Sequence, residues 1–229
     1  MQTIKAVFFE PVGCLAEFRR DEFDRAAELL RADEVAPDVS ASQVYWRLLV
    51  LMQQQPLTGE TAAKLKALEL SAVEHADLYE DVAPALTSLK SFGIAAYIVS
   101  SISQAAAARF VERHQLKDLL SGIVTRDDAQ GVGEKVLQRA TAQAGLAASE
   151  IMMLADTAEA LAAAKQLGLN AMLMINDYDE GRSLAERNPA GGIVSLAELP
   201  DALKLIEQRA GMRVAGRTPR APFELFDPS

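Results

Sequence analysis

Short runs of apolar residues recur along the chain, and helical patterns separate several of them. The apolar runs span residues 4–9, 95–100, 122–125, 151–155, 171–175 and 192–194. They lack the alternation of apolar and polar residues that marks a half-exposed sheet, and such runs are typical of parallel strands buried on both faces. The pattern therefore predicts a parallel sheet covered by helices on both sides.

Helical patterns occupy residues 103–114, 136–144 and 158–167, between successive apolar runs. Gly145 and Gly168 follow the last two, and glycine is common directly after a helix. Strands that alternate with helices in this way predict a doubly wound α/β fold, in which each helix crosses from one parallel strand to the next.

This alternation is interrupted between residues 16 and 78, where helical patterns occur without a strand-like run. Ser40 and Gln43 resemble a capping box at the start of one of these helices. We interpret residues 16–78 as a helical insert, with residues 1–15 and 79–207 forming the core. Helices packed permanently on the sheet would give the same pattern, so both arrangements remain open.

The length, the net charge and the cysteine count exclude several classes of protein. The 229 residues fit one large domain or a core with a smaller unit, and the net charge of −9 argues against a nonspecific nucleic-acid surface. The single cysteine excludes an internal disulfide framework. No leader precedes the first predicted strand and no apolar run approaches the ~20 residues of a membrane span, so we expect a cytoplasmic protein without a membrane segment.

The first predicted strand leads into a loop that contains Glu10, Val12, Gly13 and Cys14. Residues 4–15 resemble motif I of the haloacid dehalogenase-like phosphatases, a hydrophobic strand followed by Asp-x-Asp-Gly-Thr-Leu. Glu10 stands at the position of the nucleophilic aspartate, Val12 at the position of the acid/base aspartate, and Cys14 at the threonine. The segment therefore resembles a phosphotransfer loop whose two reactive aspartates are replaced.

Three later places extend the resemblance. Residues 95–101 end in Ser100 and Ser101, as in motif II, and residues 151–156 end in Asp156, as in motif IV. Lys135 could be the motif III lysine, although the spacing usual in the family would put Gly131 there. Each motif alone is common in other proteins; their order and spacing together indicate the family.

The resemblance implies a fold with a helical cap, here residues 16–78, that closes over the active site and selects the substrate. It implies catalytic positions at Glu10, Ser100 and Lys135, and phosphate binding by Gly13, Ser100 and Ser101. It also implies a weak Mg²⁺ site formed by Glu10, the backbone carbonyl of Val12 and Asp156. Without a metal, Glu10 and Asp156 would simply be solvated acids at the ends of strands.

The replacements in motif I argue against ordinary catalysis. Glu10 adds a methylene group, and a misplacement of about 1 Å can lower a rate by about 10²-fold. Val12 removes a proton-transfer group, which is typically worth about 10² to 10⁴-fold. We therefore predict a ligand-binding or interaction protein (a pseudo-phosphatase), with a small phosphorylated molecule as a possible ligand. The alternatives are a magnesium-dependent phosphatase with a variant site and a structural subunit.

Other reactive or aromatic residues receive simpler interpretations. Cys14 has no histidine near it in sequence, so we interpret it as a semi-buried thiol and not as a nucleophile. His75 and His114 are too scattered to form a zinc site. Tyr45 and Trp46 are interpreted as packing residues of the insert and not as a substrate platform.

The composition changes in the tail, residues 208–229, which is basic and contains Gly211 and Pro219. We expect no helix there. Phe223, Leu225 and Phe226 predict that the tail docks on a folded surface of the same chain, of a second copy or of another protein.

Overall fold

The computed structural model describes residues 3–29, 40–54 and 59–214. In this part of the chain, six strands form a parallel sheet in the order β5-β4-β1-β6-β7-β8. Each predicted apolar run overlaps one strand, so the predicted α/β fold with a parallel sheet is confirmed. The strands are β1 (Ala6–Phe9), β4 (Ala95–Val99), β5 (Gly122–Val124), β6 (Ile151–Ala155), β7 (Asn170–Met174) and β8 (Gly191–Ile193).

Strand β1 lies inside the sheet, with β4 on one side and β6 on the other. Phe8 is paired in register with Tyr97 of β4 and with Met153 of β6. All residues of β1 and β6 are buried, which explains why both strands are continuous apolar runs. Because the strands are parallel, the residues that follow β1, β4 and β6 meet at one edge of the sheet.

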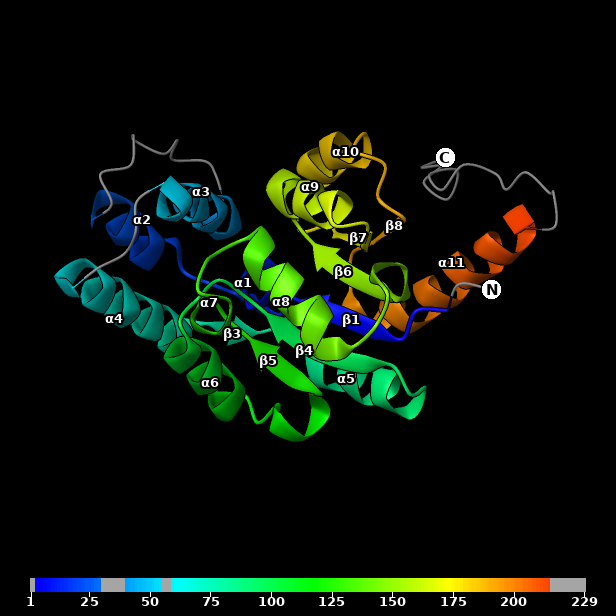
Figure 1. Ribbon diagram of the computed structural model, residues 1–229, viewed down its shortest axis with the longest axis horizontal. Coiled ribbons are helices and arrows are strands. Elements are labelled where there is room, and N and C mark those ends of the chain that lie inside the picture. Colours follow the sequence, from blue (N-terminus) through cyan, green and yellow to red (C-terminus); the bar gives the residue numbers. More distant parts are fainter. Residues whose placement is uncertain (1–2, 30–39, 55–58, 215–229) are drawn as a thin grey trace.

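Helices cover both faces of the sheet. Helices α8 and α9 pack together against β4, β5, β6 and β7, and α5 and α11 pack together on β4 and β8 (Figure 1). The helices outside the insert are α1 (Pro11–Cys14), α5 (Val82–Ser91), α6 (Gln104–Arg113), α7 (Arg126–Ala129), α8 (Glu134–Ala144), α9 (Ala158–Gln166), α10 (Tyr178–Ala185) and α11 (Leu199–Val214), with 3-10 turns at Lys117–Leu119, Ala148–Glu150 and Leu196–Glu198. None of the described helices is both long and apolar enough to cross a membrane.

The segment between β1 and α5 is helical. It contains α2 (Arg20–Leu29), α3 (Ala41–Gln54) and α4 (Gly59–His75), which Figure 1 shows gathered at the left of the sheet, away from α11. Two short antiparallel strands, β2 (Ala16–Glu17) and β3 (Asp77–Leu78), join its two ends. We call this segment the insert. Its role as a mobile cap stays a prediction.

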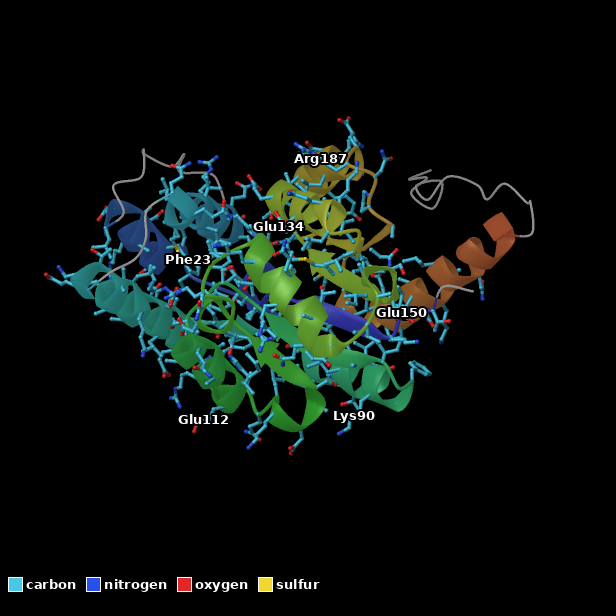
Figure 2. All side chains as sticks on the ribbon, in the orientation of Figure 1. Phe23, Lys90, Glu112, Glu134, Glu150 and Arg187 are labelled. Atoms are coloured by element: carbon cyan, nitrogen blue, oxygen red, sulfur yellow. The ribbon has the colours of Figure 1, made fainter. Side chains whose placement is uncertain are left out.

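Aromatic side chains fill the interior of the insert. Phe23 of α2, labelled in Figure 2, packs against Phe18 and Tyr45, with ring centroids 6.0 and 5.7 Å away. Phe18 in turn stacks on Phe110 of α6 at 6.0 Å. The aromatic cluster therefore continues from the insert into the core.

The expectation of no helix after Gln208 is wrong for residues 209–214, because α11 continues to Val214. A single glycine inside a helix, here Gly211, is unfavourable by only about 1 kcal/mol relative to alanine, and the next proline is Pro219. The helix thus extends beyond the predicted boundary at residue 207. The predicted docking residues Phe223, Leu225 and Phe226 lie outside the described residues.

A buried ion pair joins α4 of the insert to the core. Both guanidinium NH groups of Arg126 bond the Glu69 carboxylate, one of them at 2.9 Å, and the backbone NH of Ser103 donates to the same carboxylate at 3.0 Å. Arg126 also donates to the carbonyl of Ser101 at 2.9 Å. Since Glu69 is only 5% exposed, these contacts compensate it for its lost hydration.

We predict that Glu69→Gln lowers the free energy of unfolding by about 3 to 5 kcal/mol, because removing one partner of a buried pair leaves the other charge uncompensated. Urea unfolding followed by circular dichroism measures this loss. Glu60→Gln is the matched control, since Glu60 pairs with Lys64 on the exposed face of the same helix, and it should change stability little. Equally small effects of both changes would contradict the anchoring role of Glu69.

Candidate functional site

The carboxyl ends of β1, β4 and β6 bring Glu10, Ser100 and Asp156 to one place. These three residues are 3%, 1% and 6% exposed. The register of the three strands, with β1 between the other two, accounts for the arrangement. The sequence placed these side chains at strand ends; it did not predict that they would be fully covered.

Both carboxylate oxygens of Glu10 are engaged. The Ser100 hydroxyl donates to Oε1 at 2.6 Å, and the Tyr45 hydroxyl donates to Oε2 at 3.3 Å. The Tyr45 and Ser100 hydroxyls are themselves 3.2 Å apart. Burial raises the pKa of Glu10 to about 8, and the nearby charge of Asp156 raises it further, against the opposing hydrogen bonds. Burial therefore disfavours the ionised form of Glu10, which is the form that could act as a nucleophile.

Asp156 is held by a second hydroxyl group from the insert. The Ser42 hydroxyl hydrogen-bonds Oδ2 of Asp156 and lies 3.2 Å from the carbonyl oxygen of Val12. Burial raises the pKa of Asp156 to about 7, and the charges of Glu180 and Glu159 act in the same direction. The other oxygen, Oδ1, is buried and has no hydrogen-bond partner among the described residues.

The loop after β1 packs directly against this contact. Gly13 has a φ of +81°, and a Cβ added there would lie 1.9 Å from Oδ2 of Asp156 and 2.1 Å from Oγ of Ser42. Only glycine fits at this position, because it tolerates a positive φ and leaves room for both side chains. The loop, the insert and β6 thus converge on one point.

The insert contributes two site residues that the sequence analysis did not identify. Ser42 and Tyr45 lie one turn apart on α3 and so share one face of the helix. The interpretation of Tyr45 as a packing residue is incomplete: its ring packs on Phe23 and Trp46, while its hydroxyl reaches Glu10. Polar groups at this spacing on a largely apolar helix face were the available signal.

The contacts found for Ser101 and Lys135 involve other residues than Glu10. Ser101 is 3% exposed, and its hydroxyl accepts a hydrogen bond from the backbone NH of Gly133 at 2.8 Å. Lys135 is exposed on α8, with its side chain against Gly131. The contacts described for Glu10 and Ser100 do not include Lys135.

Two cavities flank α3. One of about 640 Å³ is lined by Ser40, Ala41 and Ser42 from the start of the helix and reaches Asp156. The other, of about 1010 Å³, is lined by Met52 and Gln53 from the end of the helix. The second cavity also includes Lys135 and Glu134; Figure 2 labels Glu134 at the end of α8 nearer the insert. Glu10 lines neither cavity, and α3 lies between them.

The thiol of Cys14 is buried, with Sγ 3.6 Å from the carbonyl oxygen of Leu154. Burial holds the pKa of Cys14 well above its ordinary value, with the charges of Asp156 and Glu10 adding to the effect. Because the thiolate is the reactive form, Cys14 is not activated as a nucleophile.

The predicted magnesium ligands offer suitable donor atoms. Glu10, the Val12 carbonyl and Asp156 supply hard oxygen donors, and Mg²⁺ commonly takes one or two carboxylates and keeps several waters. The buried and unpaired Oδ1 of Asp156 is an oxygen that a cation could satisfy. No group of three or more His, Cys, Asp or Glu side chains suited to a metal occurs within the described residues. The donor set therefore fits a weakly held, largely hydrated cation.

Comparisons with known proteins agree with this fold. A family model described as haloacid dehalogenase-like hydrolase matches residues 38–174. The chain is 29% identical over 189 residues to the enolase-phosphatase E1 of Enterobacter sp. (strain 638), covering 77% of this chain and 75% of that protein. It is 28% identical over 200 residues to the enolase-phosphatase E1 of Xylella fastidiosa (strain M12), covering 81% and 86%.

Solved structures show the same fold. A haloacid dehalogenase-like family hydrolase from Streptococcus pneumoniae superposes with a TM-score of 0.66 at 15% identity, covering 88% of this chain and 99% of that chain. An L-2-haloacid dehalogenase from Xanthobacter autotrophicus, with chloropropionic acid covalently bound, superposes with a TM-score of 0.59 at 15% identity, covering 88% and 99%.

The raised pKa values predict that the protein loses stability as pH rises. The unfolded chain ionises Glu10 and Asp156 near their ordinary values of 4.5 and 3.8, whereas the folded protein keeps both protons until about pH 8 and 7. The stability that these groups contribute is complete below pH 4 and is lost as pH rises through 8, at up to about 1.4 kcal/mol per pH unit for each group.

Urea unfolding between pH 5 and pH 8.5 measures this slope. Glu10→Gln and Asp156→Asn carry no titrating carboxyl at the respective positions, so each variant should show a shallower fall in stability than the wild type. A wild-type slope that neither variant reduces would assign the pH dependence to other groups.

Proposed function

Because the chain belongs to the haloacid dehalogenase-like hydrolase family, we propose that it is a member that binds a ligand or partner without ordinary phosphoryl transfer. The observation that carries this proposal is the covering of Glu10 by Ser100 and Tyr45, beside a valine at the acid/base position. Val12 is fully buried and has no group that could transfer a proton.

The state of Glu10 argues against nucleophilic attack. An attacking carboxylate must be ionised, with a free oxygen about 3 to 3.5 Å from phosphorus. Burial instead raises the pKa of Glu10 and so disfavours its ionised form, and both of its oxygens are held by hydroxyl groups. Attack would require α3 to withdraw Tyr45 and the carboxyl group to lose its proton.

The acid/base step has no replacement close to Val12. The two carboxyl groups of the site, Glu10 and Asp156, are the groups that the resemblance assigns to attack and to metal binding. Loss of general acid/base assistance alone lowers rates by about 10² to 10⁴-fold. The effect of Val12 does not simply multiply with that of Glu10, because residues that act as a unit are not additive.

Of the two cavities, the second is the less acidic and therefore the better place for a phosphorylated ligand. Lys66, Lys135 and Arg126 line it together with Asp127 and Glu134, and Glu69 already neutralises Arg126. The first cavity is lined by Asp81, Asp156, Glu180 and other acids, and no lysine or arginine is among its described lining residues. The Ser100 and Ser101 hydroxyls are engaged within the protein, so a phosphate group would have to displace those contacts.

The identity to enolase-phosphatases favours a second candidate, a magnesium-dependent phosphatase with a glutamate in place of the aspartate nucleophile. In this alternative, Glu10, the Val12 carbonyl and Asp156 would hold Mg²⁺, which supplies charge neutralisation for the phosphoryl group. A purely structural subunit that docks through residues 208–229 is the third alternative. A cytoplasmic location remains part of the proposal.

We predict that the wild type releases little or no phosphate from a broad panel of phosphate esters in the presence of Mg²⁺. The double change Glu10→Asp with Val12→Asp restores the family's two carboxylates and should raise the rate by at least about 10²-fold, the lower range of general acid/base assistance. Colorimetric phosphate release measures both. Asp156→Asn in the double variant should abolish the gain.

The phosphatase alternative with a glutamyl nucleophile would be established by two results together. The wild type would release phosphate in a magnesium-dependent reaction, and Glu10→Gln would abolish that reaction. Absence of turnover together with a melting temperature unchanged by any ester would favour the structural alternative, because a ligand that binds only the folded state raises the melting temperature.

A further inference from the structure

Ser42 contacts two of the groups that the candidate cation site offers. Its hydroxyl hydrogen-bonds Oδ2 of Asp156 and lies 3.2 Å from the carbonyl oxygen of Val12. We propose that the Ser42 hydroxyl occupies the position between these two oxygens that a divalent cation would take, and that it thereby weakens cation binding. This inference rests on the closed site of the proposed function, and it assigns a regulatory role to the insert.

The space between the two oxygens is too small for both occupants. Mg²⁺ binds oxygen at about 2.0 to 2.1 Å, so a cation shared by Val12 and Asp156 would lie between their oxygens. The Ser42 hydroxyl already lies within hydrogen-bonding distance of both oxygens, and Gly13 closes the space from the loop side, where even a Cβ would lie 2.1 Å from the hydroxyl. The hydroxyl must therefore move before a cation can bind the Val12 carbonyl oxygen and Oδ2 of Asp156 together.

Helix α3 holds Ser42 in place. One turn further along, Tyr45 bonds Glu10 and Ser100, and the neighbouring Gln43 donates to Glu180. Ser42 itself is 4% exposed, and the helix buries Leu48 and Leu49 behind it. Because these contacts act together, cation binding competes with the docking of α3 and not only with one side-chain rotation.

The Ser42 hydroxyl carries one hydrogen, so it donates to one of these two acceptor oxygens at a time. Alanine at residue 42 would leave the Val12 carbonyl and Oδ2 of Asp156 without this partner. In the alanine variant, a cation could bind these two oxygens without displacing a hydroxyl group. In the wild type, the Ser42 hydroxyl is already in contact with them. The substitution should therefore increase affinity for a cation, which is the opposite of the result expected if Ser42 were a ligand.

Isothermal titration of the full-length protein with Mg²⁺, and separately with Mn²⁺, tests the proposal. We expect Ser42→Ala to bind the cation about tenfold more tightly than the wild type, because cation binding no longer breaks hydrogen bonds to the hydroxyl. Adding Asp156→Asn to Ser42→Ala should remove the gain, which would locate the cation at this site. Thermal melting with and without the cation gives an independent readout.

Ser71→Ala is the matched control. Ser71 also lies in the insert and donates to a buried carboxylate, that of Glu22 at 3.2 Å, so the chemical change is the same at a remote position. This variant should bind the cation as the wild type does. Ser42→Cys, which keeps the size of the side chain but bonds more weakly, should also bind more tightly and serves if Ser42→Ala fails to fold.

Equal affinities of the wild type and Ser42→Ala, absence of binding by both, or weaker binding by Ser42→Ala would overturn the inference. The proposed function fails on a different result, robust phosphate release by the wild type, which leaves the comparison of cation affinities unchanged. The two experiments therefore separate failure of the inference from failure of the proposed function.

Discussion

The burial of two carboxyl groups at the ends of parallel strands is the constraint that organises this molecule. A buried acid without a charged partner needs a proton or hydrogen-bond donors. For Glu10 and Asp156, hydroxyl groups supply the donors, and two of those hydroxyls come from α3 of the insert. The ionisation of these acids and the position of the insert therefore depend on each other. A change in the charge of either acid changes the hydrogen bonds that hold α3 on the core.

The insert is attached to the core by two unlike interactions. At α4, a buried ion pair links Glu69 to Arg126, and aromatic rings continue into α6. At α3, neutral hydroxyl groups bond carboxyl groups whose pKa values are raised by burial, so their ionised forms are disfavoured. Charged hydrogen bonds of the first kind are generally stronger than neutral ones. We therefore expect α3 to separate from the core more readily than α4.

The sequence predicted the sheet because β1, β4 and β6 are apolar throughout. A strand that is covered on both faces needs apolar side chains on both of them. It also placed Glu10, Ser100 and Asp156 together, since parallel strands deliver their carboxyl ends to one edge. Ser42 could not be assigned in this way, because it lies 114 residues from its partner Asp156 and on a helix whose docking depends on the whole insert. For α11, ordinary helix formers outweighed Gly211, so the helix end was missed.

Helix α3 borders both cavities, one at each of its ends. Residues 40–42 border one cavity and residues 52–53 border the other, and both groups belong to the start and the end of the same helix. A ligand that shifted the whole helix from one side would also move residues that line the other cavity. By thermodynamic linkage, an effector in either cavity and a ligand in the other would then alter each other's affinity by the same factor.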